Sequence, residues 1–180
     1  RNHYDLAFDR AGRCYTFDSD MEWDLGLPWY RPTRLLEVMP GGEYGWRRGS
    51  SVWPEEYEDS LPAVVNAGRG SPSGVVVYSG AAYPEKYDNA VIAGDWSQGR
   101  ILAFTRDAAG VFAAEPEWLL SGRPLNVTDL AVDSKGRVLF VTGGRGTRGG
   151  LYRLACDVPA QPRSAEMSHA PVRRSLSEPV

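Results

Sequence analysis

The sequence predicts an all-β fold made of several small antiparallel sheets, and three observations indicate it. Short apolar segments recur along the 180 residues, and none has a long helical periodicity. The chain contains 20 Gly and 13 Pro, which favour turns, together with 6 Trp and 9 Tyr, which suit strands. Finally, one strand–turn–strand segment occurs twice. Such repetition is typical of sheets arranged radially around an axis.

The repeated segment is Asp-Leu-Ala-Phe-Asp-Arg-Ala-Gly-Arg at residues 5–13, which recurs as Asp-Leu-Ala-Val-Asp-Ser-Lys-Gly-Arg at residues 129–137. A second apolar strand follows each copy, at residues 14–17 and 138–141. The Asp-x-x-Gly between the two strands fits a tight turn, in which Asp accepts backbone hydrogen bonds and Gly adopts a positive φ. We therefore expect two equivalent hairpins in a radial fold.

A diverged unit lies between the two copies. Strands are expected at residues 74–78, 90–95 and 100–105, with a weaker outer strand over 112–120. Together these units predict a partial β-propeller of about three four-stranded antiparallel blades, because closing a ring takes four to eight blades. The blades are expected at roughly 1–47, 73–120 and 127–155, with a long loop at 48–72.

The two ends of the chain lead to separate expectations. Residues 156–180 are rich in Pro, Ser and Arg, so a disordered tail or linker is predicted there. The chain opens on Arg1 with neither Met nor a leader, which indicates a piece of a longer protein. The net charge of −3 with mixed signs gives no basis for nucleic-acid binding, and no apolar run is long enough for a membrane span.

Four acidic residues alternate along one segment: Asp18, Asp20, Glu22 and Asp24. In an extended chain their carboxylates would project from one side, and several oxygen ligands together suit calcium. The segment lacks the EF-hand pattern, which requires Gly and Glu where Trp23 and Trp29 stand. A metal site is one hypothesis. A solvated acidic loop, or ion pairs with Arg31 and Arg34, is the alternative.

Aromatic residues crowd the long loops. Trp29 and Tyr30, followed by Arg31, are candidates for binding a sugar ring, because an aromatic face with a polar rim suits a sugar. The alternative is that such rings pack the loops onto the sheets, and this alternative is favoured for Trp46 and Trp53.

Two further candidate sites lie at expected strand ends on one rim. Asp95 and Trp96 are predicted to face a ligand, since Asp95 has no counterpart in the repeat. Asp5 and Asp129 occur in both copies and are interpreted as structural. The Gly-rich segment 143–150 lacks the Lys-Ser/Thr of a phosphate-binding loop, so an inter-strand loop is predicted, with Arg145 directed toward the ring centre.

Several strings carry a family resemblance: residues 1–16, residues 39–46 and the Trp-containing runs 18–34 and 94–97. Over about residues 1–155 the chain resembles the soluble quinoprotein glucose/sorbosone dehydrogenases. It is most similar to planctomycete-type propeller proteins often fused to cytochrome c. The resemblance implies a six-bladed ring, pyrroloquinoline quinone, calcium, a sugar or alcohol substrate, a cytochrome c partner and a periplasmic or secreted location.

Within that resemblance, Arg1 and Asn2 match an Arg-Asn pair that contacts the quinone. The family's Lys and two Arg align with Ser97, Asn126 and Thr128, none of them cationic, and its catalytic His lies upstream of Arg1. The expected function is thus a propeller module of a sugar/alcohol dehydrogenase-like oxidoreductase, inactive alone. The alternative is a non-catalytic propeller scaffold that binds a carbohydrate or protein partner.

Overall fold

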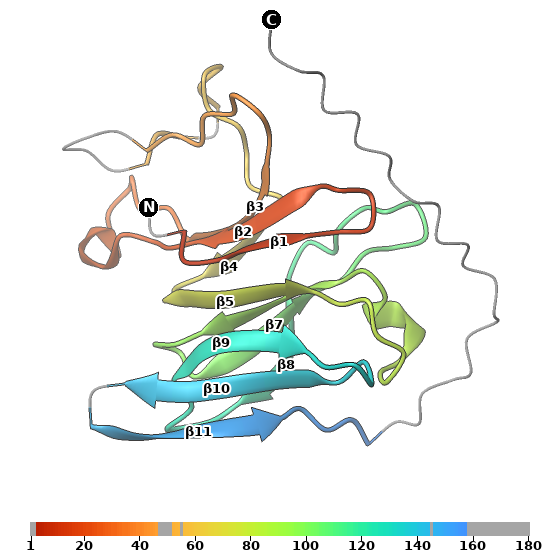
Figure 1. The fold of residues 1–180 in the computed structure, drawn as a ribbon. Coiled ribbons are helices and arrows are strands. Elements are labelled where there is room, and N and C mark those ends of the chain that lie inside the picture. The colour runs from red at the N-terminus through yellow and green to blue at the C-terminus, as the bar shows by residue number, and fades with distance from the viewer. Residues whose placement is uncertain (1–2, 47–51, 55, 145, 158–180) are drawn as a thin grey trace, which may run out of the picture.

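The computed structural model describes residues 3–46, 52–54, 56–144 and 146–157. Within these ranges it is all-β, with three antiparallel sheets and two short 3-10 turns, η1 (Glu22–Asp24) and η2 (Glu85–Tyr87) (Figure 1). The first sheet contains β1 (Leu6–Phe8), β2 (Cys14–Asp18), β3 (Thr33–Val38) and β4 (Val65–Gly68). The second contains β5 (Pro72–Val77), β6 (Val91–Asp95), β7 (Arg100–Phe104) and β8 (Glu117–Ser121). The third contains β9 (Val127–Val132), β10 (Val138–Gly144) and β11 (Thr147–Arg153).

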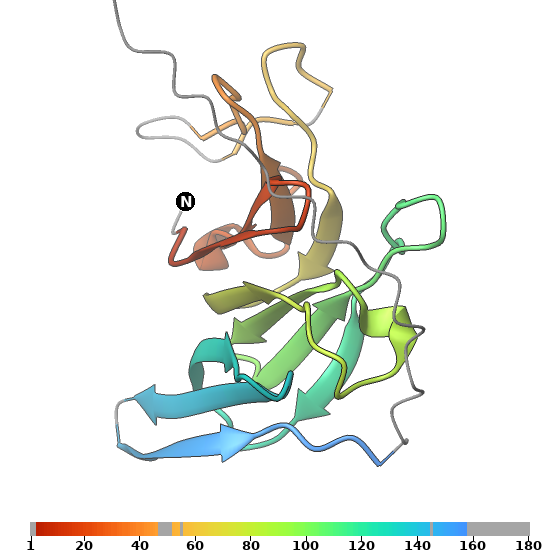
Figure 2. The same cartoon turned by 45° about the vertical axis from the view of Figure 1, so that its right-hand side comes forward.

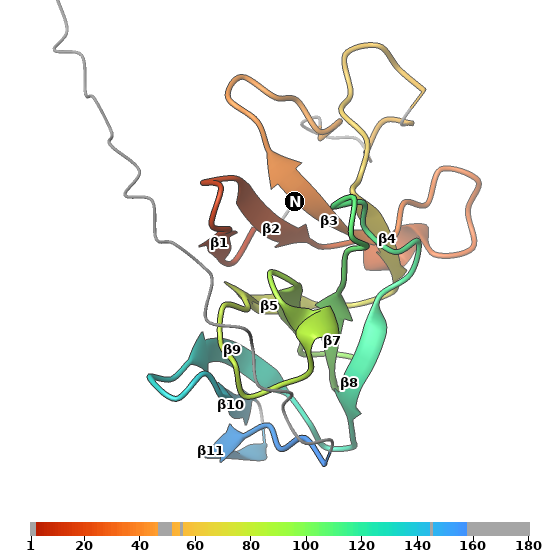
Figure 3. The ribbon, with the colours of Figure 1, turned by 90° about the vertical axis from the view of Figure 1, so that its right-hand side faces the viewer.

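The three sheets lie side by side, each starting from its innermost strand. β1 contacts β5, and β5 contacts β9, so the first strands of the sheets line a common axis while the later strands lie further out (Figures 1 and 2). Figure 3 shows the same sheets stacked in chain order. This arrangement confirms the expected partial propeller. The third sheet has three strands in the described ranges, where the other two have four.

One predicted boundary is wrong. The segment 48–72, expected as a loop, contains β4, which completes the first sheet by pairing with β3. Val65 and Ala67 are buried whereas Asn66 and Gly68 are exposed, so β4 has the two-residue alternation of a half-buried strand. Four residues next to Gly- and Pro-rich sequence are too few for that alternation to stand out.

The repeated hairpins adopt the same turn, as predicted. The backbone N–H of Asp9 donates to the Arg13 carbonyl at 2.9 Å, and that of Asp133 donates to the Arg137 carbonyl at 2.9 Å. In each copy the Asp carboxylate accepts two backbone N–H groups and the Arg Nε, the latter at 2.7 Å. The hydrogen bonds from Arg137 lower the pKa of Asp133 to about 2.

The core consists of two layers between neighbouring sheets. Between the first and second sheets, Phe17 and Phe104 pack edge to face with their ring centroids 5.6 Å apart. Between the second and third sheets, Tyr78 donates its hydroxyl to the Gly136 carbonyl at 2.7 Å, among buried residues such as Ile101 and Phe140. The second sheet is therefore buried on both faces, as a middle blade must be.

The first sheet is covered on its other face by the chain itself. The described parts of the segment 39–64 fold back over it (Figure 1), and Thr16 and Leu36, which point away from the second sheet, are buried. Tyr44 fixes this segment by donating its hydroxyl to the Glu37 carbonyl at 2.6 Å. No helix in the described ranges has the length and apolar character needed to cross a membrane.

Candidate functional site

The candidate site residues gather at one rim of the three sheets. In each antiparallel sheet the second strand ends and the third begins at the same end, so the loops 18–33 and 95–100 and the end of β10 at Gly144 lie on the same side of the sheets, at the left of Figure 1. We call this edge the loop rim. Arg1, Asn2 and Arg145, predicted to face the quinone or the ring centre, lie outside the described residues.

The rim of the first sheet is built on a buried ion pair. Asp18 ends β2 and lies directly across from Arg34 on β3. The Arg34 Nη2 lies 3.1 Å from the Asp18 Oδ2, and both side chains are almost completely buried. The Trp46 indole Nε1 donates to the same oxygen at 2.8 Å, and the Arg34 Nη2 also donates to the Tyr44 carbonyl at 2.7 Å. A buried charge requires such compensation, so this pair supports the fold at the rim.

The second sheet contains a matching pair. Asp95 ends β6 and pairs in register with Arg100 at the start of β7, with 2.8 Å between the Arg100 Nε and the Asp95 Oδ2. The backbone N–H of Ser71 donates to the Asp95 Oδ1 at 2.8 Å. The Arg100 Nη2 donates to the carbonyls of Ala67 and Arg69, at 3.0 and 2.7 Å, and so links the second sheet to the end of β4.

These contacts change the interpretation of Asp95. Its side chain has no solvent exposure, and its carboxylate is taken up by Arg100 and by backbone donors. The geometry thus supports a structural role rather than contact with a ligand. The inference that Asp95 has no counterpart is also wrong, because Asp18 occupies the same position in the first sheet. The loops after these residues differ in length, which hides the match in the sequence.

The four alternating acidic residues do not converge. The extended segment assumed for them is wrong at its C-terminal end, where the chain tightens into η1 and the Asp24 N–H donates to the Met21 carbonyl at 3.0 Å. Asp18 is committed to Arg34, and Glu22 is exposed. Among the described residues no group of three or more His, Cys, Asp or Glu side chains is close enough to hold a metal ion.

Asp20 is buried beside Tyr30. The Tyr30 hydroxyl donates to the Asp20 Oδ2 at 2.7 Å. Burial raises the pKa of Asp20 above its usual value, although the hydrogen bond from Tyr30 opposes this shift. Burial and the same hydrogen bond raise the pKa of the Tyr30 hydroxyl. The Tyr30 side chain is therefore fixed by its hydrogen bond to Asp20 within the loop. The Arg31 Nη1 donates to the Tyr30 backbone carbonyl at 3.0 Å, so Arg31 is also engaged within the loop.

The tryptophans divide into two kinds. Trp46 donates to Asp18 and so ties its loop to β2, whereas Trp53 packs within the loop against Tyr57, with ring centroids 5.3 Å apart. Trp23 and Trp29 are exposed by 68% and 49% at the rim of the first sheet. These two rings are the ones that a ligand approaching this rim could contact.

Trp96 links two sheets, a role that sequence analysis missed. Its indole Nε1 donates to the Gly143 carbonyl at 2.8 Å, and its own carbonyl accepts the Asn126 Nδ2 at 2.9 Å. Its ring lies so close to Gly144 that a Cβ there would be 2.7 Å from the ring. The Gly143-Gly144 pair in the sequence was the available signal, since glycine permits such close approach.

The rim residues that align with the family's cations do not fit a quinone. The Ser97 hydroxyl lies 3.4 Å from the Asp95 Oδ1, Asn126 donates to Trp96, and the Thr128 hydroxyl donates to the Val141 carbonyl at 3.3 Å. All three side chains serve contacts within the protein, and none is cationic. A quinone bearing carboxylates requires positive partners, which these described positions do not supply.

Comparison with known proteins finds matches to the fold among solved structures. No family model matches the chain, and no curated protein matches its sequence. Among solved structures, a glucose dehydrogenase matches with a TM-score of 0.70 and 18% identity over 88% of this chain and 45% of its own. A glucose dehydrogenase-type oxidoreductase of Thermus thermophilus matches with a TM-score of 0.65 and 17% identity, covering 86% and 45%. The PQQ-bound aldose sugar dehydrogenase of Streptomyces coelicolor matches with a TM-score of 0.63 and 18% identity, covering 85% and 42%.

The chain has the fold of part of a β-propeller. It spans less than half the length of each of these solved propeller chains, in agreement with three sheets that do not close a ring. At these identities the likeness concerns the fold, and the function of this propeller segment has to be argued from its own residues.

Proposed function

We propose that this propeller segment is a module of a sugar- or alcohol-dehydrogenase-like oxidoreductase and that it has no dehydrogenase activity by itself. The observation that carries the proposal is the arrangement of the three sheets, which matches part of glucose and aldose sugar dehydrogenase propellers. The exposed Trp23 and Trp29 at the loop rim would then contact the sugar.

The chemistry would be supplied by other parts of such a protein. At the rim, Ser97, Asn126 and Thr128 supply no cation for a quinone, the described residues form no cluster for calcium, and the buried carboxylates Asp18 and Asp95 are paired with arginines. A base that accepts the substrate proton would therefore come from the remaining blades. Those blades, a cytochrome c module and a periplasmic or secreted location are the setting that this proposal implies.

The test compares this chain with a longer protein that contains it. Dye reduction is measured with a panel of aldoses and alcohols, in the presence of calcium and pyrroloquinoline quinone. The proposal predicts turnover by the longer protein and none by residues 1–180. Turnover by the 180-residue chain, or a longer protein that binds quinone but oxidises none of the panel, would contradict it.

A second function is favoured by one specific observation: Ser97, Asn126 and Thr128 are all occupied within the protein. This would suit a non-catalytic propeller scaffold that binds a carbohydrate or protein partner and has lost its cofactor contacts. The melting temperature separates the two candidates. If calcium and quinone leave the melting temperature of the longer protein unchanged while an aldose raises it, the scaffold is the better description.

A further inference from the structure

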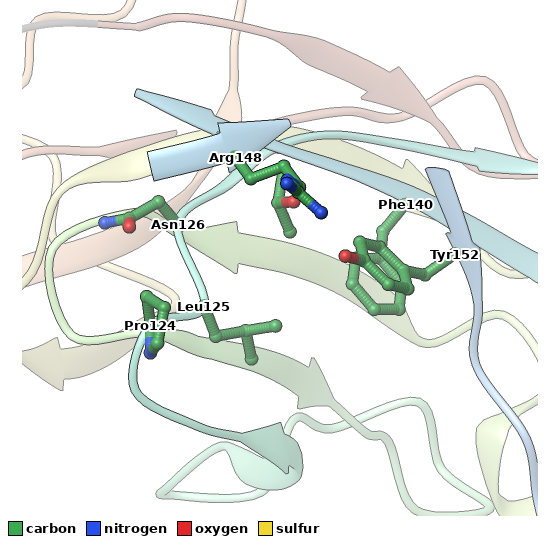
Figure 4. A pocket seen from close by; sticks show the side chains of 7 residues that line it. Pro124, Leu125, Asn126, Phe140, Arg148 and Tyr152 are labelled. Carbon is green, nitrogen blue, oxygen red and sulfur yellow. The ribbon is translucent and has the colours of Figure 1, made fainter. Parts of the chain in front are cut away.

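A cavity of about 310 Å³ opens between the second and third sheets at the loop rim (Figure 4). The β8–β9 connection forms one wall with Pro124, Leu125 and Asn126. One face of the third sheet forms the other wall, with Phe140 and Thr142 from β10 and Arg148 and Tyr152 from β11. This volume is at the lower end of the range for small-molecule sites.

At this cavity the third sheet lacks the ion pair that the other two sheets contain. Thr142 follows Asp129 at the same spacing at which Asp18 follows Asp5, and Gly150 pairs with Thr142 as Arg34 pairs with Asp18. Thr142 and Gly150 therefore replace the acid and the arginine.

In the second sheet the corresponding space is filled by the Arg100 guanidinium, which reaches the carbonyls at the end of β4. Gly150 has no side chain that could reach across this space, and the Tyr152 ring lies over it instead, with its hydroxyl 2.6 Å from where a Gly150 Cβ would be. The opening is thus a local departure of the third sheet from the pattern that the first two sheets share.

Among the residues that line the cavity, Arg148 carries a positive charge. Arg148 lies two residues before Gly150 and so projects to the same face of β11. In the described part of the chain, Arg148 forms neither an ion pair nor a hydrogen bond. By contrast Arg10, Arg34 and Arg100 are each paired with a carboxylate. No Asp or Glu is among the residues that line the cavity. The positive charge of Arg148 is therefore available for an anion.

The cavity also contains a stacked aromatic pair. The rings of Phe140 and Tyr152 are 5.3 Å apart at an interplanar angle of 21°. Phe140 is buried, whereas Tyr152 is 49% exposed. Figure 4 shows both rings together, with Arg148 on the same wall and Leu125 directed toward them from the other side. An aromatic face beside a guanidinium suits a ring that carries an anionic group.

We propose that this cavity binds a small six-membered ring that carries a carboxylate. The ring lies on Tyr152, the carboxylate accepts hydrogen bonds from the Arg148 guanidinium, and the Thr142 hydroxyl supplies a further polar contact. A guanidinium matches a carboxylate because it can donate two parallel hydrogen bonds. The site does not depend on the proposed dehydrogenase function, and it is separate from the exposed tryptophans at the rim of the first sheet.

The probes are D-glucuronate and benzoate, with D-glucose as the uncharged match, measured by saturation-transfer NMR and titration calorimetry on the whole chain. We expect at least one of the two carboxylates to bind at least about tenfold more tightly than glucose. Arg148→Gln should weaken that binding by about tenfold or more, because the variant removes the charge-assisted hydrogen bonds to the carboxylate.

Arg153→Gln is the matched control. Arg153 is on the same strand and exposed, but its position places it on the opposite face of β11, so this variant should bind as the unchanged protein does. Binding of glucuronate alone identifies a sugar acid as the ligand class, and binding of benzoate alone identifies an aromatic acid. The proposal is overturned if neither carboxylate binds, if glucose binds as tightly, or if Arg148→Gln leaves the affinity unchanged.

Discussion

Asp18 and Asp95 occupy the same position in neighbouring sheets, each at the end of the second strand and each paired in register with a buried arginine. The Arg34–Asp18 and Arg100–Asp95 contacts are 3.1 and 2.8 Å long. Each arginine also donates to backbone carbonyls outside its own strand pair. Arg34 donates to Tyr44, which follows β3, and Arg100 donates to Ala67 and Arg69 at the end of β4. The Arg100–Asp95 pair thus joins the second sheet to the end of β4, and the Arg34–Asp18 pair joins the first sheet to the segment that contains Tyr44.

Arg100→Met should destabilise the protein by about 3–5 kcal/mol, because it leaves the Asp95 carboxylate buried without its cation. Urea unfolding followed by circular dichroism measures the change. Arg10→Met is the control, since the Arg10–Asp88 pair is partly exposed and should cost about 1 kcal/mol or less. Equal losses for the two variants would refute the structural role of the buried pair.

Gly12→Ala and Gly136→Ala should differ although both glycines occupy the same turn. Their φ angles are 80° and 74°, so alanine is strained at either position by about 1–2 kcal/mol. A Cβ at Gly12 meets nothing within 4 Å, whereas at Gly136 it would be 2.7 Å from the Ala81 nitrogen. We expect the Gly136 variant to be clearly less stable in chemical unfolding. Equal stabilities would mean that the turn of the third sheet does not pack against the second sheet.

Asp20→Asn should stabilise the protein at neutral pH. Burial raises the pKa of Asp20 in the folded protein above the value in the unfolded chain, so ionisation of Asp20 favours unfolding. The penalty is present above the folded pKa and disappears as the pH falls below the unfolded pKa, where both forms are protonated. Unfolding free energies at pH 7 and pH 3.5 should therefore differ between variant and parent only at pH 7. A less stable variant at pH 7 would instead indicate that the carboxylate is needed as an anion.

Acid should weaken the two repeated turns. Asp133 has a folded pKa of about 2, below its usual value of 3.8, so its contribution to stability is present above the unfolded pKa and is lost as the pH falls toward 2. Asp133→Asn should flatten the pH dependence of stability in that window and leave the dependence above pH 5 unchanged. A pH profile identical to that of the parent would contradict the assignment.

Trp96→Phe should loosen the contact between the second and third sheets. The variant removes the hydrogen bond from the indole Nε1 to the Gly143 carbonyl, which should cost about 1 kcal/mol. Trp29→Phe is the control, because Trp29 is half-exposed and its replacement should change stability by under about 0.5 kcal/mol. Thermal melts of the two variants, run side by side, separate these expectations.

The sequence was sufficient for the parts of the fold that rest on short-range chemistry. The turns at Asp9 and Asp133 could be predicted because the turn requires an Asp that accepts local N–H groups and a Gly with positive φ. Both residues lie within nine consecutive residues, so the pattern is visible in the sequence. Pairing between residues that are far apart in the chain produces no such local pattern. The loop between Asp18 and Arg34 is much longer than the loop between Asp95 and Arg100, so the equivalence of the two pairs emerges only from strand register.

The candidate site was harder to predict for the same reason. Alternating charges predicted a carboxylate cluster, but burial of Asp18 by Arg34 and the turn at η1 separate the side chains. The cavity beside Gly150 could not be found from the sequence, because strand register decides which residues of β10 and β11 face one another there. Its residues, Thr142 and Arg148, are unremarkable until β10 and β11 bring them to one face.

The central claim is that the three sheets are successive blades around one axis, and an experimental structure superposing residues 5–18 on residues 129–142 tests it most directly. The account predicts that one rotation relates the two copies, that half of this rotation about the same axis places Asp18 on Asp95, and that Thr142 occupies the third position. Two copies that pack within one sheet, or whose rotation does not carry Asp18 to Asp95, would contradict the account.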